Sequence, residues 1–404
     1  MVGLSAPLAA VVSLSRRLGA DGFTFESSGA QAVSFLTVVF ARAEQLSVLG
    51  LILVELARGG RLEELKSVSG FDIAVHLHSL RRQAAMWDLE TDSVLRQLSQ
   101  AGVSTVLLKG AALRFTAYRD SAERTFGDID VLVPKDSLQE AVAALVDRGY
   151  EPDSGQKIKL YLEHFHHLIL RKPSGFVAEV HWALEPVKSL PGLDSAAFLR
   201  DARWVVTPEG ARARVPSPEH MVLHLAQQNL DDGFSQLRRL VDVDRVVSTA
   251  SDFDWAQLAS ESKQMWMQGA VALTLRLAEL LLGTDVPAGF IHGLGLSRAA
   301  RTHLALLDPV ALVLERRGQR RAVSELLLLW CMPDVPTRLR TLKEIGTGER
   351  DRPWLTIAPG SFASGTRTRV AAVAKLAAYQ AFLYPAALFG TRASARQRDK
   401  FWGR

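Results

Sequence analysis

Cysteine is almost absent from this sequence, because Cys331 is the only one in 404 residues. A single thiol excludes an internal disulfide framework and is typical of a reducing compartment, so we expect a cytoplasmic protein. The pattern of a secretory signal is also lacking: Arg16 and Arg17 follow the first apolar stretch, whereas a signal peptide places its basic residues before it. We therefore expect a helix in this stretch.

A strong charge of either sign is missing as well. The 48 basic and 43 acidic side chains leave a net charge of +5, which is too small over this length to predict nucleic-acid binding, although it leaves an RNA partner open. The basic tail after Gly390 follows an apolar run at 370–390, which Lys375 and Pro385 interrupt. That segment is compatible with peripheral contact to an anionic membrane surface or an acidic partner, but we favour a core helix that ends in solvated charge.

Internal repeats and low-complexity tracts are absent. The regions of the chain differ instead in the spacing of their apolar residues. Apolar residues at three- and four-residue spacing predict helices from Gln31 to Ala57 and from Ile73 to Leu98. Short β-branched runs and turns follow, and helical spacing then returns. We therefore expect an α+β protein whose small mixed β-sheet core is flanked by N-terminal and C-terminal helical regions. The predicted domains are 1–100, 101–215, 216–345 and 346–404, the last being a linker and a basic amphipathic segment.

Two aspartates stand one residue apart in the stretch "TFGDIDVLV", residues 125–133. Successive strand side chains alternate between faces, so Asp128 and Asp130 point to the same side of the strand that this run predicts. Like charges at that range repel, and the arrangement is favourable mainly when a cation or a proton lies between them. Two hard carboxylate ligands are suited to Mg²⁺ or Mn²⁺.

A glycine precedes these aspartates in "LLKGAAL", residues 107–113. We expect a strand to end at Lys109 and a helix to follow, so that the free amides of Gly110 and Ala111 form its positive end, where phosphate binds well. Lys109 and Arg124 are expected to steady the same phosphates. A phosphate cradle close to a divalent-cation site suggests phosphoryl or nucleotidyl transfer.

A third acid stands inside the apolar stretch "FVAEVHW", residues 176–182. Glu179 would lie in the middle of a strand, where an unpaired acid is rare. A two-metal displacement needs a third carboxylate, and Glu179 is the candidate. His181 shares its face, and we expect this histidine to form a hydrogen bond rather than to assist a nucleophile.

Together these motifs resemble the nucleotidyltransferase superfamily that includes DNA polymerase β, and in particular its large, uncharacterised bacterial branch. The resemblance covers about residues 70–285 and rests on "LLKGAAL", "DIDVLV", an acid before "HW" and "PSPEHMVLHLA". It implies a small mixed sheet with Asp128, Asp130 and Glu179 as metal ligands and with Gly110 at the nucleotide phosphates.

Two departures from the superfamily pattern stand out. Ala111 follows the glycine where the superfamily has serine, which removes one phosphate contact. The stretch "LAQQN" replaces a histidine that the pattern places near Gln227 or Gln228.

The sequence thus predicts a magnesium-dependent nucleotidyltransferase that moves a nucleoside monophosphate from an NTP to an acceptor and releases pyrophosphate. The acceptor, a small molecule, peptide or protein, is expected between the core and the helices after Pro216. One alternative is a catalytically silent protein that binds nucleotide or a partner, and another is an RNA-modifying enzyme. Several histidines suggest zinc, but we find no third ligand for them and predict no zinc site; they are His164, His166, His167, His220 and His224.

Overall fold

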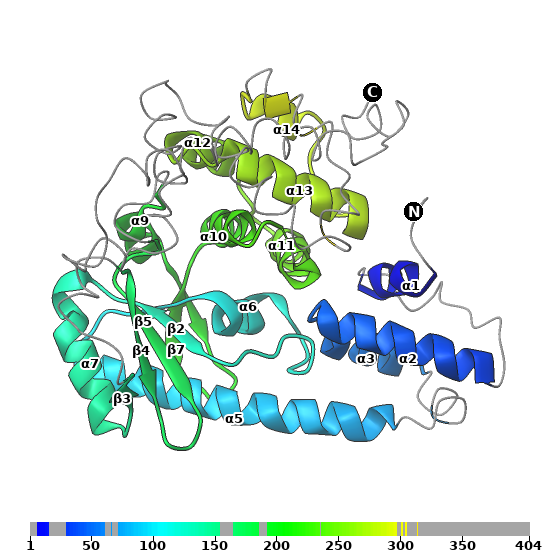
Figure 1. Cartoon of the computed structure of the whole chain (residues 1–404). Coiled ribbons are helices and arrows are strands. Elements are labelled where there is room, and N and C mark those ends of the chain that lie inside the picture. The colour runs from blue at the N-terminus through cyan, green and yellow to red at the C-terminus, as the bar shows by residue number, and fades with distance from the viewer. Residues whose placement is uncertain are drawn as a thin grey trace, which may run out of the picture.

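The computed structural model describes residues 6–15, 30–60, 66, 72–153, 165–185, 192–234, 236–296, 300, 301, 304 and 313. Cys331 and the expected segment 346–404 lie outside these residues, and the division into domains stays a prediction. The described chain confirms the predicted α+β class, with a five-stranded mixed sheet, a two-stranded sheet and many helices (Figure 1). No helix in it is both long and apolar enough to cross a membrane.

The N-terminal part of the described chain is helical, as predicted. Its helices are α1 Ala6–Ser15, α2 Ala30–Gln45, α3 Leu49–Arg58 and α5 Ile73–Gln100. The helix expected from Gln31 to Ala57 is divided into α2 and α3, because Ser47 adopts a left-handed φ of 59° that no α-helix continues through. Asp72 starts α5 by accepting a hydrogen bond from the Val75 amide, and α5 then runs along one side of the sheet (Figure 1).

The larger sheet has the strand order β1-β2-β5-β4-β3. Only β2 and β5 are parallel, while every other neighbouring pair is antiparallel. A parallel pair needs a crossover connection, and the chain between β2 and β5 supplies it with α7 and two further strands. The elements are β1 Val106–Leu107, β2 Ile129–Leu132, a 3₁₀ turn η1 Lys135–Ser137, α7 Leu138–Asp147, β3 Glu151–Pro152, β4 His167–Arg171 and β5 Val177–His181.

The two faces of this sheet differ in chemistry because side chains alternate along each strand. One face is apolar and buried, and α7 contacts the sheet there; it carries Ile129, Val131, Leu168, Leu170, Ala178 and Val180. The other face carries Asp130, Glu179, His167 and His181. The polar residues therefore gather on the face that the later helices approach.

A helical region covers the polar side. Short α6 (Lys109–Ala117) contacts both β2 and α11, and α10, α11 and α13 pack on one another (Figure 1). Ser217 accepts a hydrogen bond from the His220 amide and Pro218 occupies the first turn, so α10 begins as its sequence predicts. The helices are α9 Ser195–Arg200, α10 Pro218–Asp231, α11 Leu237–Thr249, α12 Trp255–Gln264, α13 Gln268–Leu282 and α14 Phe290–Gly293.

A two-stranded hairpin before α10 was not expected from the sequence. Strands β6 Arg203–Val206 and β7 Arg212–Val215 pair antiparallel, and β7 contacts β1. The turn between them contains Gly210 at a φ of 87°, which glycine adopts without strain. The available signal was the alternation "RARV" after a turn containing proline and glycine.

The packing of α3 against the loop before β2 generates a stability prediction. A Cβ added to Gly50 would lie 2.0 Å from the backbone oxygen of Ala122. Alanine normally favours a helix over glycine by about 1 kcal/mol, but overpacking here should reverse that sign and destabilise Gly50→Ala by about 1–3 kcal/mol. Chemical denaturation measures this free energy of unfolding.

Gly293→Ala is the matched control, because a Cβ at that helical position meets nothing within 4 Å. It should be neutral or slightly stabilising. If Gly50→Ala is as stable as the wild type, α3 does not pack on Ala122 in this way.

Candidate active site

Two acids face one another across the parallel strands. Asp130 of β2 is paired in register with Glu179 of β5, so the two side chains lie side by side on the polar face. Asp130 is 1% exposed, and Asp128 is half-buried just before β2. The expectation that Glu179 reaches the aspartates from a neighbouring strand therefore agrees with the topology.

Lys109 supplies a positive charge to this acidic cluster. Its Nζ lies 2.6 Å from Asp130 Oδ1 and 3.4 Å from Glu179 Oε2. The residue has a φ of 47°, a conformation that a non-glycine side chain adopts only under strain. Lys109 was expected at phosphates, but in this structure its ammonium contacts the carboxylates, and the phosphate role stays a prediction.

The acids titrate differently because their surroundings differ. Burial raises the pKa of Asp128 to about 6, and the carboxylates of Asp130 and Glu179 add to the rise. Burial also opposes ionisation of Glu179, but the His181 hydrogen bond and the Lys109 charge outweigh it and hold the pKa of Glu179 below its usual range. A cation, the Lys109 ammonium, and a readily bound proton at Asp128 thus offset the repulsion among the three acids.

His181 completes this cluster. Its Nε2 lies 2.9 Å from Asp130 Oδ1 and 3.4 Å from Glu179 Oε2. Donor atoms of Asp130, Glu179 and His181 lie within 4.8 Å of one another, close enough to share one metal ion. The hydrogen bond agrees with the role expected for this histidine.

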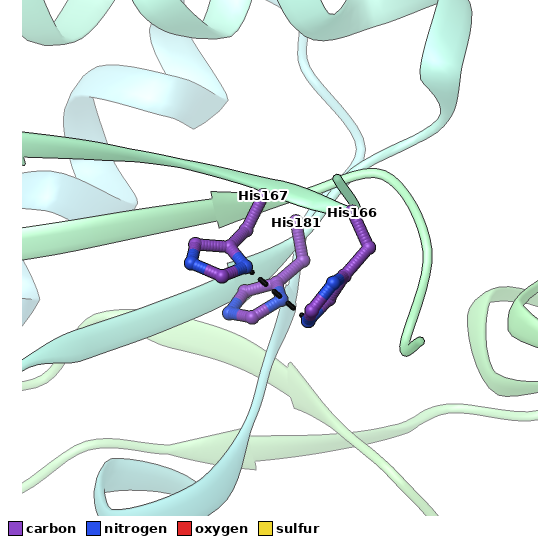
Figure 2. Close-up of side chains that lie close together, drawn as sticks. All are labelled: His166, His167 and His181. Carbon is purple, nitrogen blue, oxygen red and sulfur yellow. Dashed lines mark hydrogen bonds between the residues drawn. The ribbon is translucent and has the colours of Figure 1, made fainter. Parts of the chain in front are cut away.

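Two further histidines lie beside His181 (Figure 2). His167 is paired in register with His181 across β4 and β5, and His166 Nε2 is 3.2 Å from His167 Nδ1. Burial and the neighbouring imidazoles lower the pKa of His166 to about 2 and that of His167 to about 4. No third ligand for these histidines is evident in the sequence, but the register of β4 on β5 brings His181 to them.

Gly110 allows α6 to approach the loop before β2. A Cβ at this position would lie 2.7 Å from Phe126 Cβ and 3.4 Å from Arg124 Nη1. Gly110 and Ala111 are both buried in the first turn of α6. The close packing explains why glycine stands here independently of any phosphate contact.

Arg124 is held by an acid from the helical region. Its guanidinium donates to Asp242 of α11 through Nε at 2.8 Å and Nη2 at 3.1 Å, and Tyr118 Oη donates to the same carboxylate at 2.7 Å. Asp242 is 0% exposed. This buried hub ties α11 to the loop that leads into β2, so Arg124 has a structural role, while its expected contact with phosphate stays a prediction.

A cleft of about 350 Å³ lies over the acids. One wall contains Lys109, Gly110, Arg124, Asp128, Asp130 and His166, and the opposite wall contains His224, Gln227, Gln228, Asp231, Arg238 and Arg239. The second wall comes from α10, α11 and the turn between them, which is where the acceptor was expected. The arginines of this second wall, Arg238 and Arg239, were not predicted as site residues. The stretch "LRRLVDVDRVV" predicts a helix, but it does not indicate which side of that helix faces the acids.

Arg238 differs from the other arginines of the cleft. Its Nε is buried without a hydrogen-bond partner among the described residues, whereas Arg239 is engaged by Asp232 and by the Gln228 carbonyl. Burial and the charge of Arg124 lower the pKa of Arg238. A half-buried cation of this kind is suited to an anionic ligand.

A family model described as uncharacterised nucleotidyltransferase matches residues 38–283, more than half of the chain. The chain belongs to this family. Its membership makes the protein an enzyme of the transferase class and confirms the resemblance drawn from the sequence. The match includes both acid-bearing strands and ends at Gly283, the left-handed residue that terminates α13. No curated protein matches the chain.

The acids of this nucleotidyltransferase fit a divalent cation. Carboxylate oxygens are the ligands that Mg²⁺ and Mn²⁺ prefer, and Asp130 Oδ2 is buried with no hydrogen-bond partner among the described residues. Such an orphaned oxygen is costly unless something else binds it. Asp128, Asp130 and Glu179 stay the predicted ligands of such an ion.

The Arg124–Asp242 hub of the nucleotidyltransferase predicts a large loss of stability. Asp242→Asn removes the charge that neutralises a buried guanidinium, and breaking such a pair costs about 3–5 kcal/mol. The free energy of unfolding in urea should fall by that amount.

Asp252→Asn is the matched control, since Asp252 is 71% exposed and its contact with Arg203 is 3.4 Å. An exposed pair contributes about 0–1 kcal/mol. Equal stabilities for the two variants would contradict the structural role of the hub.

Proposed function

We propose that this protein is a Mg²⁺- or Mn²⁺-dependent nucleotidyltransferase that moves a nucleoside monophosphate from an NTP to an acceptor hydroxyl and releases pyrophosphate. The observation that carries the proposal is the register pair of Asp130 and Glu179, beside a cleft that Asp128 and Asp130 line. Family membership supports the reaction class. A cytoplasmic location is part of the same proposal and rests on the single cysteine.

The residues in and beside the cleft have different proposed roles. Asp128, Asp130 and Glu179 would hold divalent ions, which supply charge neutralisation and polarise the acceptor oxygen. Gly110 and Ala111 present the amides that begin α6, where a phosphate is favoured. These groups lie in fixed positions, so catalysis is mostly positioning and electrostatic stabilisation.

Two arginines, one from each wall of the cleft, would bind the triphosphate. Arg238 is a half-buried cation without a partner for its Nε among the described residues, and Arg124 reaches the same cleft while Asp242 holds it. Lys109 would leave the carboxylates when metal binds and then meet a phosphate. In this proposed movement, the divalent ion replaces the Lys109 ammonium as the cation that the carboxylates bind.

The reaction is a displacement at the α-phosphorus. The acceptor oxygen forms a bond to this phosphorus, the bond from it to the bridging oxygen of the β-phosphate breaks, and pyrophosphate leaves with that electron pair. The acceptor proton leaves to solvent through the open cleft. The arginines offset the charge that grows on the leaving group.

One observation favours a second function, a silent nucleotide-binding protein. Lys109 Nζ already lies 2.6 Å from Asp130, in a place where a metal ion would bind that carboxylate. If the lysine stayed there during nucleotide binding, it would replace the ion and prevent turnover. The presence of all three acids favours the enzyme instead.

Metal binding gives the first test. Asp128→Asn and Asp130→Asn each remove a charged ligand, so Mn²⁺ affinity in the presence of a non-hydrolysable NTP should fall at least tenfold in isothermal titration calorimetry. Asp136→Asn is the control, because Asp136 is an exposed acid in η1 outside the cleft. Unchanged affinity in both site variants would remove the metal from the proposal.

Glu179→Gln separates the enzyme from the silent binder. The proposed phosphate contacts come from α6 and the arginines, so NTP affinity should change little, while pyrophosphate release with a cell extract as acceptor source should fall about a hundredfold or more. Labelled NTPs in the same extract identify the species that gains the nucleotide. A wild-type protein that binds NTP and Mn²⁺ but labels nothing and releases no pyrophosphate would favour the silent binder.

A further inference from the structure

Three histidines form a cluster, and the proposed transfer gives none of them a role. His166 lies at the end of the loop before β4, His167 begins β4, and His181 ends β5 (Figure 2). We infer that His166, His167 and His181 bind a transition-metal ion of the zinc class, at a site next to the proposed magnesium ligands Asp128, Asp130 and Glu179. The inference does not depend on nucleotidyl transfer.

The distances suit a shared ion. One ring nitrogen from each histidine lies within 4.8 Å of the others, and His166 Nε2 is 3.2 Å from His167 Nδ1. Nitrogen ligands at about 2.0–2.1 Å from a tetrahedral Zn²⁺ stand about 3.3 Å apart. The ring centroids are 4.5 Å apart for His166 and His167 and 4.9 Å apart for His167 and His181, so small side-chain rotations suffice.

The donor type selects the metal. Imidazole nitrogen binds Zn²⁺, Co²⁺, Ni²⁺ and Cu²⁺ well, whereas Mg²⁺ prefers oxygen. The Nδ1 atom of His181 is buried without a hydrogen-bond partner among the described residues. Buried nitrogen atoms that lack partners are expected to have a ligand in the native protein.

The surroundings supply the other requirements of a metal site. His181 Nε2 is 2.9 Å from Asp130 Oδ1, and a carboxylate behind a histidine commonly fixes the ring and leaves the second nitrogen for the metal. His166 lines the cleft, which provides an entry path and an open coordination position.

The experiment uses the full chain without nucleotide. Protein loaded with Zn²⁺ or Co²⁺ is separated from free metal by gel filtration, and the bound metal is measured by plasma mass spectrometry. The wild type should retain about one ion per chain, and its Co²⁺ form should show the visible absorption of a four- or five-coordinate nitrogen site. His166→Gln and His167→Gln should each lower Co²⁺ affinity by at least about tenfold, since even the loss of an outer partner of a ligand costs that much.

His224→Gln is the matched control, because His224 lines the same cleft from α10 but lies outside the cluster. It should retain the ion. The thermal unfolding of each variant without metal identifies any misfolded protein, and bound Co²⁺ should raise the unfolding temperature of the wild type but not of His166→Gln. A wild type that retains no metal, equal affinity in the histidine variants, or loss of the ion in Asp128→Asn with retention in both histidine variants would each overturn the inference.

Discussion

The parallel pairing of β2 with β5 is the constraint on which the whole site depends. It sets Asp130 opposite Glu179 and brings the end of β5, with His181, beside the same carboxylates. A slip of one residue would send Glu179 to the apolar face, because side chains alternate along a strand. The crossover through α7, together with the apolar face that it contacts, therefore fixes the chemistry as well as the fold.

Holding these acids together has a cost that the surrounding chain offsets. Lys109 adopts a strained backbone conformation and places its ammonium against Asp130, while the His181 ring nitrogen donates a hydrogen bond to the same oxygen. Strain of this kind persists only where the surrounding structure imposes it, and it is typical of functional sites. The Lys109 ammonium thus neutralises part of the charge at the proposed cation site.

Local sequence patterns predicted the strands and the helix that contain the candidate site residues. They could not predict which elements far apart in the sequence lie next to one another. Alternation predicted a shared face for Asp128 and Asp130, and an acid inside an apolar strand predicted Glu179 as a site residue; the structure pairs Glu179 in register with Asp130. The partner of Arg124 was not predictable, because Asp242 lies 118 residues away on a helix whose facing side no local pattern reveals. The histidine cluster was missed for a similar reason, since it needs the register of β4 on β5.

The central claim is that Asp128, Asp130 and Glu179 form one divalent-cation site, and anomalous scattering from Mn²⁺ tests it most directly. Crystals grown with Mn²⁺ and a non-hydrolysable NTP should show an anomalous peak in contact with the carboxylates of Asp130 and Glu179, with Lys109 Nζ moved away from Asp130. Bound nucleotide without such a peak, and with Lys109 still on Asp130, would contradict the account.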